Sequence, residues 1–136
     1  MRPDTARTIH IAAALIDDAE GRLLLVRKSG TKWFMQAGGK IEAGEDPLSA
    51  LRRELHEEIG LSLDHADARF LGTFQATAAN EAGCIVQAEI FHVRCDCQPE
   101  PNAEIAEAVW VSQEEALALP LAPLTREHVV PLLATL

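Results

Sequence analysis

The chain has 136 residues, of which 48% are apolar and 24% charged, and its formal net charge is −9. This length favours one domain with a real core over two, and the composition is globular rather than disordered or fibrous. The acidic balance argues against a binding surface for duplex nucleic acid, because such surfaces cluster Lys and Arg. A polyanionic ligand would therefore need a cation to mediate its binding.

In chain order, the first expected elements are two apolar strands over 8–17 and 22–28, joined by a turn in which Gly21 supplies a positive φ. A loop over 29–40, closed by Gly38 and Gly39, comes next. No apolar run approaches the roughly 20 residues that a membrane span needs, and residues 1–10 lack the hydrophobic centre of a signal peptide. We therefore expect a cytoplasmic protein that does not enter a membrane.

A helix over Pro47–Ile59 has the clearest boundaries in the chain. Asp46 is suited to cap its N-terminus, Pro47 to occupy its first turn and Gly60 to end it. Apolar residues at helical spacing predict the stripe that packs on a sheet: Leu48, Leu51, Leu55 and Ile59.

Two long strands over 68–78 and 84–95 surround a short polar turn and predict a hairpin. A polar loop over 96–108 leads to a short strand over 109–111, and a helix starts at Ser112 with Glu115 completing a capping box. A last helix over 125–136 should be truncated or kinked by Pro131. Strands before, between and after helices predict an α/β fold with a mixed sheet sandwiched by helices.

Three cysteines, Cys84, Cys95 and Cys97, lack the spacing of a zinc site. We expect Cys84 and Cys95 to be reduced, in or beside a strand, because a disulfide would be unusual in the cytoplasm.

The expected helix carries three glutamates, Glu54, Glu57 and Glu58, at spacings where side chains become neighbours. Each pair of like charges at such spacings costs roughly 0.2–0.5 kcal/mol, so stability alone would not select them. A divalent cation that prefers oxygen ligands, such as Mg²⁺, turns this repulsion into attraction and bridges an acidic protein to a phosphate substrate.

The segment from Gly39 to Leu61 resembles the Nudix box of the Nudix hydrolases. Nine positions of that box have fixed spacing, and all are filled here: Gly39, Glu45, Arg53, Glu54, Leu55, Glu57, Glu58, Gly60 and Leu61. The preceding strands and the late segment over 104–111 also resemble the family, so the similarity spans most of the chain.

The resemblance implies a single Nudix domain over residues 1–136, an α/β/α sandwich with a mixed sheet. It implies hydrolysis of a nucleoside diphosphate linked to a group X, by attack of water on a phosphorus of the pyrophosphate. The implied metal ligands are Glu54, Glu57, Glu58 and the backbone carbonyl of Gly39, with Mg²⁺ as the cofactor and Mn²⁺ able to substitute. Arg53 would hold a box carboxylate in place, which fits its i, i+4 spacing to Glu57, and Glu45 would be a structural partner.

The general base stays open between Glu54, the first choice, and two acids before Trp110, Glu104 and Glu107. Glu107 is also a candidate substrate-binding residue. Arg27 and Lys28 end the second strand on opposite faces, so one of them is expected to reach a substrate phosphate.

Substrate choice rests on elimination within the family. The chain has no tyrosine, unlike the dinucleoside polyphosphate group, and lacks the proline that often follows the box in ADP-ribose hydrolases. Its small size resembles the MutT-like nucleoside triphosphate pyrophosphohydrolases. ADP-ribose or another nucleotide sugar is the alternative substrate, and a non-catalytic ligand-sensing domain or an isomerase of the same fold are the other classes. A homodimer is left open. Four aromatic residues are candidates for stacking on a base: Trp33, Phe34, Phe74 and Phe91.

Overall fold

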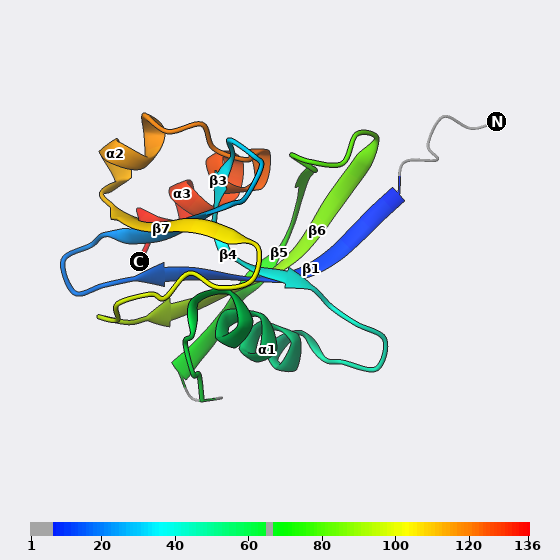
Figure 1. Ribbon diagram of the computed structural model, residues 1–136, viewed down its shortest axis with the longest axis horizontal. Coiled ribbons are helices and arrows are strands. Elements are labelled where there is room, and N and C mark those ends of the chain that lie inside the picture. Colours follow the sequence, from blue (N-terminus) through cyan, green and yellow to red (C-terminus); the bar gives the residue numbers. More distant parts are fainter. Residues whose placement is uncertain (1–6, 65–66) are drawn as a thin grey trace.

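The computed structural model describes residues 7–64 and 67–136, so the expectation for the first six residues lies outside the described part of the chain. The strands are β1 (Arg7–Asp17), β2 (Leu23–Lys28), β3 (Phe34–Met35), β4 (Ala37–Lys40), β5 (Ala68–Thr77), β6 (Cys84–Arg94) and β7 (Ile105–Val111). The helices are α1 (Pro47–Ile59), α2 (Gln113–Leu117), the π-helical η2 (Thr125–Val129) and α3 (Val130–Leu133). Figure 1 shows their arrangement.

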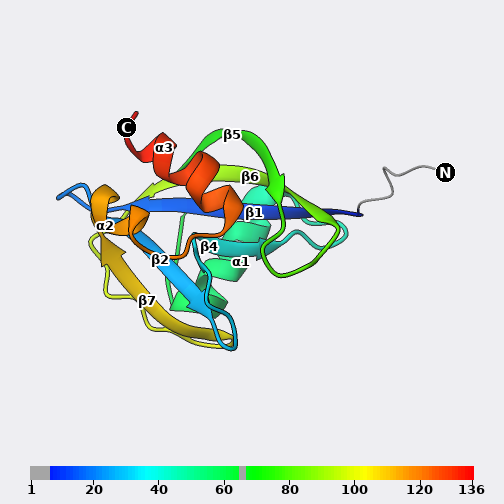
Figure 2. The ribbon, with the colours of Figure 1, turned by 90° about the horizontal axis from the view of Figure 1, so that it is seen from above.

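The strands form one mixed sheet in the order β3-β2-β1-β6-β5, with β4 paired to β1 and β7 paired to β2. The pair of β1 and β6 is parallel, whereas the other pairs are antiparallel. Helix α1 covers one face, and α2, η2 and α3 lie over the other (Figures 1 and 2). The predicted fold class, a mixed sheet between layers of helices, is confirmed. Within the described ranges, no helix is long and apolar enough to cross a membrane.

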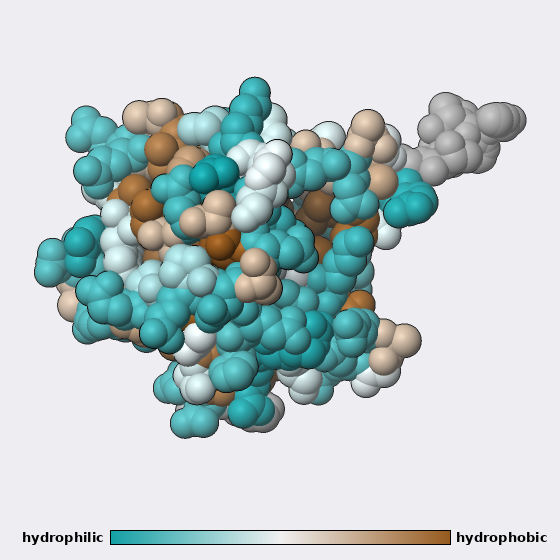
Figure 3. All heavy atoms as spheres, in the orientation of Figure 1, coloured by the Kyte–Doolittle hydropathy of each residue, from teal (hydrophilic) through white to brown (hydrophobic). Residues whose placement is uncertain are grey.

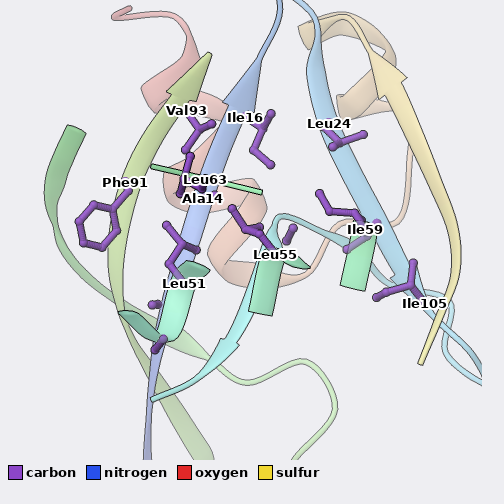
Figure 4. Close-up of a cluster of buried hydrophobic side chains, with 14 residues drawn as sticks. Ala14, Ile16, Leu24, Leu51, Leu55, Ile59, Leu63, Phe91, Val93 and Ile105 are labelled. Carbon is purple, nitrogen blue, oxygen red and sulfur yellow. The ribbon is translucent and has the colours of Figure 1, made fainter. Parts of the chain in front are cut away.

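From Ala12 onward, strand β1 is buried on both faces, which explains the continuous apolar run in this part of the strand. Its even-numbered residues, such as Ala14 and Ile16, pack with Leu51 and Leu55 of α1 (Figure 4). Its odd-numbered residues, such as Leu15, pack toward the C-terminal helices. A strand rather than a helix therefore lies at the centre of both clusters.

Helix α1 begins and ends where the sequence predicts. Asp46 accepts a hydrogen bond from the Ser49 backbone N–H at 2.8 Å, Pro47 is in the first turn, and Gly60 adopts a left-handed φ of 69°. The apolar stripe faces the sheet, with Leu51, Leu55 and Ile59 buried and Leu48 partly buried. These signals lie within a few residues of each helix end, so they do not depend on the rest of the fold.

Several other predictions are confirmed. The β1–β2 turn contains Gly21 with φ of 79°, strands β5 and β6 form an antiparallel hairpin, and the Ser112–Glu115 capping box is present. Cys84 begins β6 and Cys95 directly follows it. Both are free thiols.

Three element assignments need correction. Residues 34–40 are not a loop but contain β3 and β4, because glycines without a Cβ let β4 pair closely with β1. Strand β7 begins at Ile105, since its partner β2 extends the pairing to Lys28, so Glu107 lies in a strand. The last helix is a π turn followed by one α turn that contains Pro131. The Val130 N–H reaches back five residues to the Thr125 carbonyl.

Candidate active site

Two glycines of β4 lie against the glutamate-bearing face of α1. Gly38 has φ of 145°, and a Cβ on it would be 2.8 Å from the Ala13 Cα. Gly39 has no positive φ, but a Cβ on it would be 2.7 Å from Oε2 of Glu54. Gly38 thus permits the strand pairing, and Gly39 leaves room for a carboxylate. Backbone conformation therefore explains the glycine at position 38 but not the one at position 39.

The carboxylates of Glu54 and Glu58 both lie at this glycine pair. The Gly38 N–H donates a hydrogen bond to Oε1 of Glu58 at 3.2 Å. Glu58 is only 8% exposed, and burial is the main reason that its pKa rises to about 7; the negative charges of Glu54 and Glu104 raise it further. A nearby cation would stabilise the ionised form of this carboxyl group.

Arg53 binds three carboxylates of the box. Its Nε and Nη2 donate to the two oxygens of Glu45 at 2.8 and 2.9 Å, and its Nη1 donates to Glu54 at 2.8 Å. The expected contact with Glu57 is present, but it is longer, at 3.5 Å. The bonds from Arg53 lower the pKa of Glu45 to about 2. Arg53 therefore holds Glu54 in place while Glu45 fixes Arg53.

The third glutamate of the cluster is set apart from the other two. The Glu57 side chain is 54% exposed, whereas that of Glu54 is 17% exposed. Among the described residues, no three His, Cys, Asp or Glu side chains are gathered closely enough to hold a metal ion. Two carboxylates at the glycine pair nevertheless provide oxygen donors for a hard cation, and Glu57 would have to turn from Arg53 to join them.

Arg27 and Lys28, the last two residues of β2, differ in whether they face this site. The Arg27 Nε donates to Glu107 at 2.8 Å, and its Nη1 donates to the Thr31 carbonyl at 2.8 Å. Lys28 instead lines a recess in the protein surface, and Glu58 lines the same recess. The roles of Arg27 and Glu107 in substrate binding stay predictions, although neither lines this recess.

Beyond the charged groups, the recess extends along the sheet. One end contains Lys28, Gly38, Gly39 and Glu58. Figure 3 shows it as a hollow with hydrophobic atoms at its floor, between the C-terminal helices and the β5–β6 hairpin. Its apolar wall consists of Ile9, Ile11, Val26, Met35 and Val86. None of the four aromatic residues considered for stacking lines it, since Phe34 and Phe91 are buried in the core and Phe74 packs on His128.

Sequence reasoning missed the amide side chains of the recess, Gln36 and Asn80. Gln36 lies between β3 and β4, and both strands contribute residues to the recess. Because residues 29–40 were expected to form a loop, no strand face could be assigned to Gln36 from the sequence.

Comparisons with known proteins agree with this geometry. The family model of the NUDIX domain matches residues 7–133. The chain is 35% identical over 124 residues to the CTP pyrophosphohydrolase of Escherichia coli (strain K12), covering 86% of this chain and 85% of that protein. It is 41% identical over 59 residues to the 8-oxo-dGTP diphosphatase of Haemophilus influenzae, covering 40% of this chain and 43% of that one. The MutT protein from Methanosarcina mazei Go1 has a similar fold, with a TM-score of 0.79 at 22% identity over 96% of each chain.

Proposed function

The chain belongs to the Nudix hydrolase family, whose members act on phosphoric anhydrides, and we propose that its substrate is a nucleoside triphosphate or a modified triphosphate. Water attacks a phosphorus of the pyrophosphate and releases the nucleoside monophosphate and pyrophosphate. ADP-ribose or another nucleotide sugar is the second candidate. We also propose that residues 1–136 form one Nudix domain that works in the cytoplasm, and a homodimer stays a prediction.

One observation carries the substrate proposal: a single recess combines a charged end with an apolar wall. Lys28 and the Gly38–Gly39 backbone supply positive and polar groups for phosphates beside Glu58, and the aliphatic wall suits a planar base. The E. coli relative is named for cleavage of CTP and the H. influenzae relative for cleavage of 8-oxo-dGTP. Both names support a triphosphate over a nucleotide sugar.

Nudix hydrolases generally use divalent metals, and for this chain we propose Mg²⁺, with Mn²⁺ able to substitute. The residues present fit such an ion in two ways. The absence of a Cβ on Gly39 lets the Glu54 carboxylate lie against the residue whose carbonyl would share the ion. The buried Glu58 has a raised pKa, and a bound cation would lower that pKa again. Glu54, Glu57, Glu58 and the Gly39 carbonyl would hold it. When bound, the ion neutralises phosphate charge and lowers the pKa of water.

The protein's own groups orient the reactants. Arg53 fixes the Glu54 carboxylate through the bond at 2.8 Å and is itself held by Glu45. Lys28, which lines the same recess as Glu58, offsets phosphate charge. Glu54 is the proposed base that accepts the proton from the attacking water. Glu104 is the alternative because its charge reaches Glu58, whereas Glu107 is occupied by Arg27.

A panel of nucleoside triphosphates, 8-oxo-dGTP and ADP-ribose, incubated with the protein and Mg²⁺, tests this function by product analysis. We expect monophosphate and pyrophosphate from at least one triphosphate, with loss of turnover in excess chelator. Glu57→Gln should lower turnover, while Glu114→Gln, the same charge change on exposed α2, should not. More efficient cleavage of ADP-ribose than of any triphosphate would reverse the order of the two substrates. No hydrolysis of any compound would favour a ligand-sensing domain.

A further inference from the structure

Gln36 is a buried amide with an unusual partner. It lies between β3 and β4 in the wall of the recess and is only 6% exposed. The hydroxyl of Thr125, the first residue of η2 and fully buried, donates a hydrogen bond to its Oε1 at 2.8 Å. This bond joins residues 89 positions apart, so the C-terminal helix orients a side chain of the recess.

The bond from Thr125 also decides which end of the amide stays available. A buried hydroxyl needs an acceptor, and Oε1 of Gln36 is the acceptor that the structure gives it. The Nε2 group then retains two hydrogens, with no acceptor among the residues that the structure describes. A buried donor without a partner is destabilising, and a ligand that supplies an acceptor would remove this cost.

We propose that Gln36 is a specificity-determining residue whose Nε2, oriented by Thr125, donates a hydrogen bond to an oxygen or ring nitrogen of the nucleotide base. This inference rests on the proposed function, because it places the base in the apolar part of the recess. Because the Nε2 group of Gln36 can only donate, it favours a base that presents a carbonyl oxygen or a ring nitrogen at this contact. A base that presents an amino group there is disfavoured. Asn80 also lines the recess, but it is exposed and free to present either end of its amide.

Thr125→Val tests the inference, because it removes the hydroxyl but keeps the branched shape, and Thr125→Ser is the control that keeps the hydroxyl. The measurement is kcat/KM for ATP, GTP, CTP and UTP. We expect the wild type to prefer its best base over its worst by about tenfold or more. In Thr125→Val this ratio should fall severalfold through KM, with kcat on the best substrate little changed. Thr125→Ser should restore the ratio.

Gln36→Met is a second test of the inference, which can be used if Thr125→Val fails to fold. It removes the amide but preserves the length of the side chain and its apolar packing. It should abolish the base preference. An equal ratio of kcat/KM in the wild type, a folded Thr125→Val and Gln36→Met would overturn the inference.

A second readout does not depend on turnover. The side-chain amide resonances of Gln36, identified by their loss in Gln36→Met, should shift when the preferred nucleoside monophosphate is titrated into the metal-free protein. The same titration should leave them unshifted in Thr125→Val at equal ligand concentration. If the wild type cleaves no triphosphate, the proposed function fails, and the titration alone decides the inference. Binding of a monophosphate without a shift of these resonances, or no binding of any of the four, would overturn it.

Discussion

The carboxylate of Glu54 occupies the space that a side chain on residue 39 would need. A Cβ built on Gly39 would be 2.7 Å from its Oε2 and closer still to its Cδ and Oε1. Gly39 does not have a positive φ, unlike the other glycines of the described chain. The glycine is therefore required by its contact with Glu54 and not by its own backbone conformation.

Gly39→Ala should therefore displace Glu54 and lower turnover although no charge changes. We expect a loss of about 1–3 kcal/mol in the free energy of unfolding, typical of overpacking, and weaker affinity for Mn²⁺. Urea denaturation and an Mn²⁺ titration of wild type and variant measure the two effects. This cost exceeds that of an ordinary surface glycine substitution, because the new methyl group would meet the Glu54 carboxylate, which Arg53 holds in place.

A double-mutant cycle tests whether the cost of Gly39→Ala comes from its contact with Glu54. In a Glu54→Ala background the methyl group of Gly39→Ala has nothing to displace, so its cost in unfolding free energy should shrink. An equal cost in both backgrounds would mean that the glycine serves the backbone alone, and the link between Gly39 and the metal ligands would be withdrawn.

Glu58→Gln should reveal the raised pKa of Glu58 in the metal-free protein. With a folded pKa of about 7 and an ordinary value of 4.5, the folded state holds the proton more tightly than the unfolded state. Stability is therefore lost as pH rises from about 4.5 through 7. The glutamine does not titrate, so the stability of the variant relative to wild type should increase by on the order of 1–3 kcal/mol between pH 4.5 and pH 8.

Thermal melts at these two pH values, with chelator present, measure this difference. Glu57→Gln is the matched control, because its parent side chain is exposed and the pH dependence should stay that of the wild type. Added Mg²⁺ should raise the melting temperature of the wild type more than that of Glu58→Gln. A stability difference that is the same at both pH values would contradict a raised pKa at Glu58.

The sequence predicts those parts of the fold whose causes are local. Helix α1 carries its cap, its proline and its terminal glycine within its own segment, and the structure confirms all three. Strands β3 and β4 could not be predicted from local sequence, because they depend on partners distant in the sequence. The Phe34 N–H donates to the Pro120 carbonyl, and Gly38 pairs with Ala13 of β1. Glycine is rare in strands, so local propensity favoured a loop.

The candidate site divides in the same way. Spacing along one helix predicted that Glu54 and Glu58 would be neighbours, and the structure places both at the glycine pair. The orientation of Lys28 could not be predicted, because a strand end alone does not reveal which face will carry the recess. Gln36 acquires its partner from a residue 89 positions away, and no local pattern contains that information.

Lys28→Met and Arg27→Met make the same charge change at adjacent positions and should have different effects. Lys28 lines the recess, so its loss should lower kcat/KM by about tenfold or more. Arg27 is paired with Glu107 at 2.8 Å, so its loss should cost at most about 1 kcal/mol of stability and leave kcat/KM within a few fold. Steady-state kinetics of both variants on the best triphosphate measure these effects. An equal loss of kcat/KM in Arg27→Met would support Arg27 as a substrate-binding residue.

The pairing of Arg53 with Glu45 predicts an acid-sensitive site. Hydrogen bonds from Arg53 hold the pKa of Glu45 at about 2, below its ordinary value of 4.5. The stabilisation from this pair is therefore present above about pH 4.5 and is lost as pH falls toward 2. Glu45→Gln should lower the urea midpoint at pH 7, and the difference from wild type should narrow as pH approaches 2.

Measuring kcat of Glu45→Gln distinguishes a role of Glu45 in positioning Glu54 from a role in stability alone. If Glu45 fixes Arg53, and Arg53 in turn fixes Glu54 through the bond at 2.8 Å, then Glu45→Gln should lower kcat at pH 7 under conditions where the protein is fully folded. KM for the nucleotide should change little, because Glu45 does not line the recess. Glu42→Gln, a neighbouring acid whose backbone N–H contacts Glu45, is the control and should keep kcat. A folded Glu45→Gln with unchanged kcat would show that Arg53 holds Glu54 without help from Glu45.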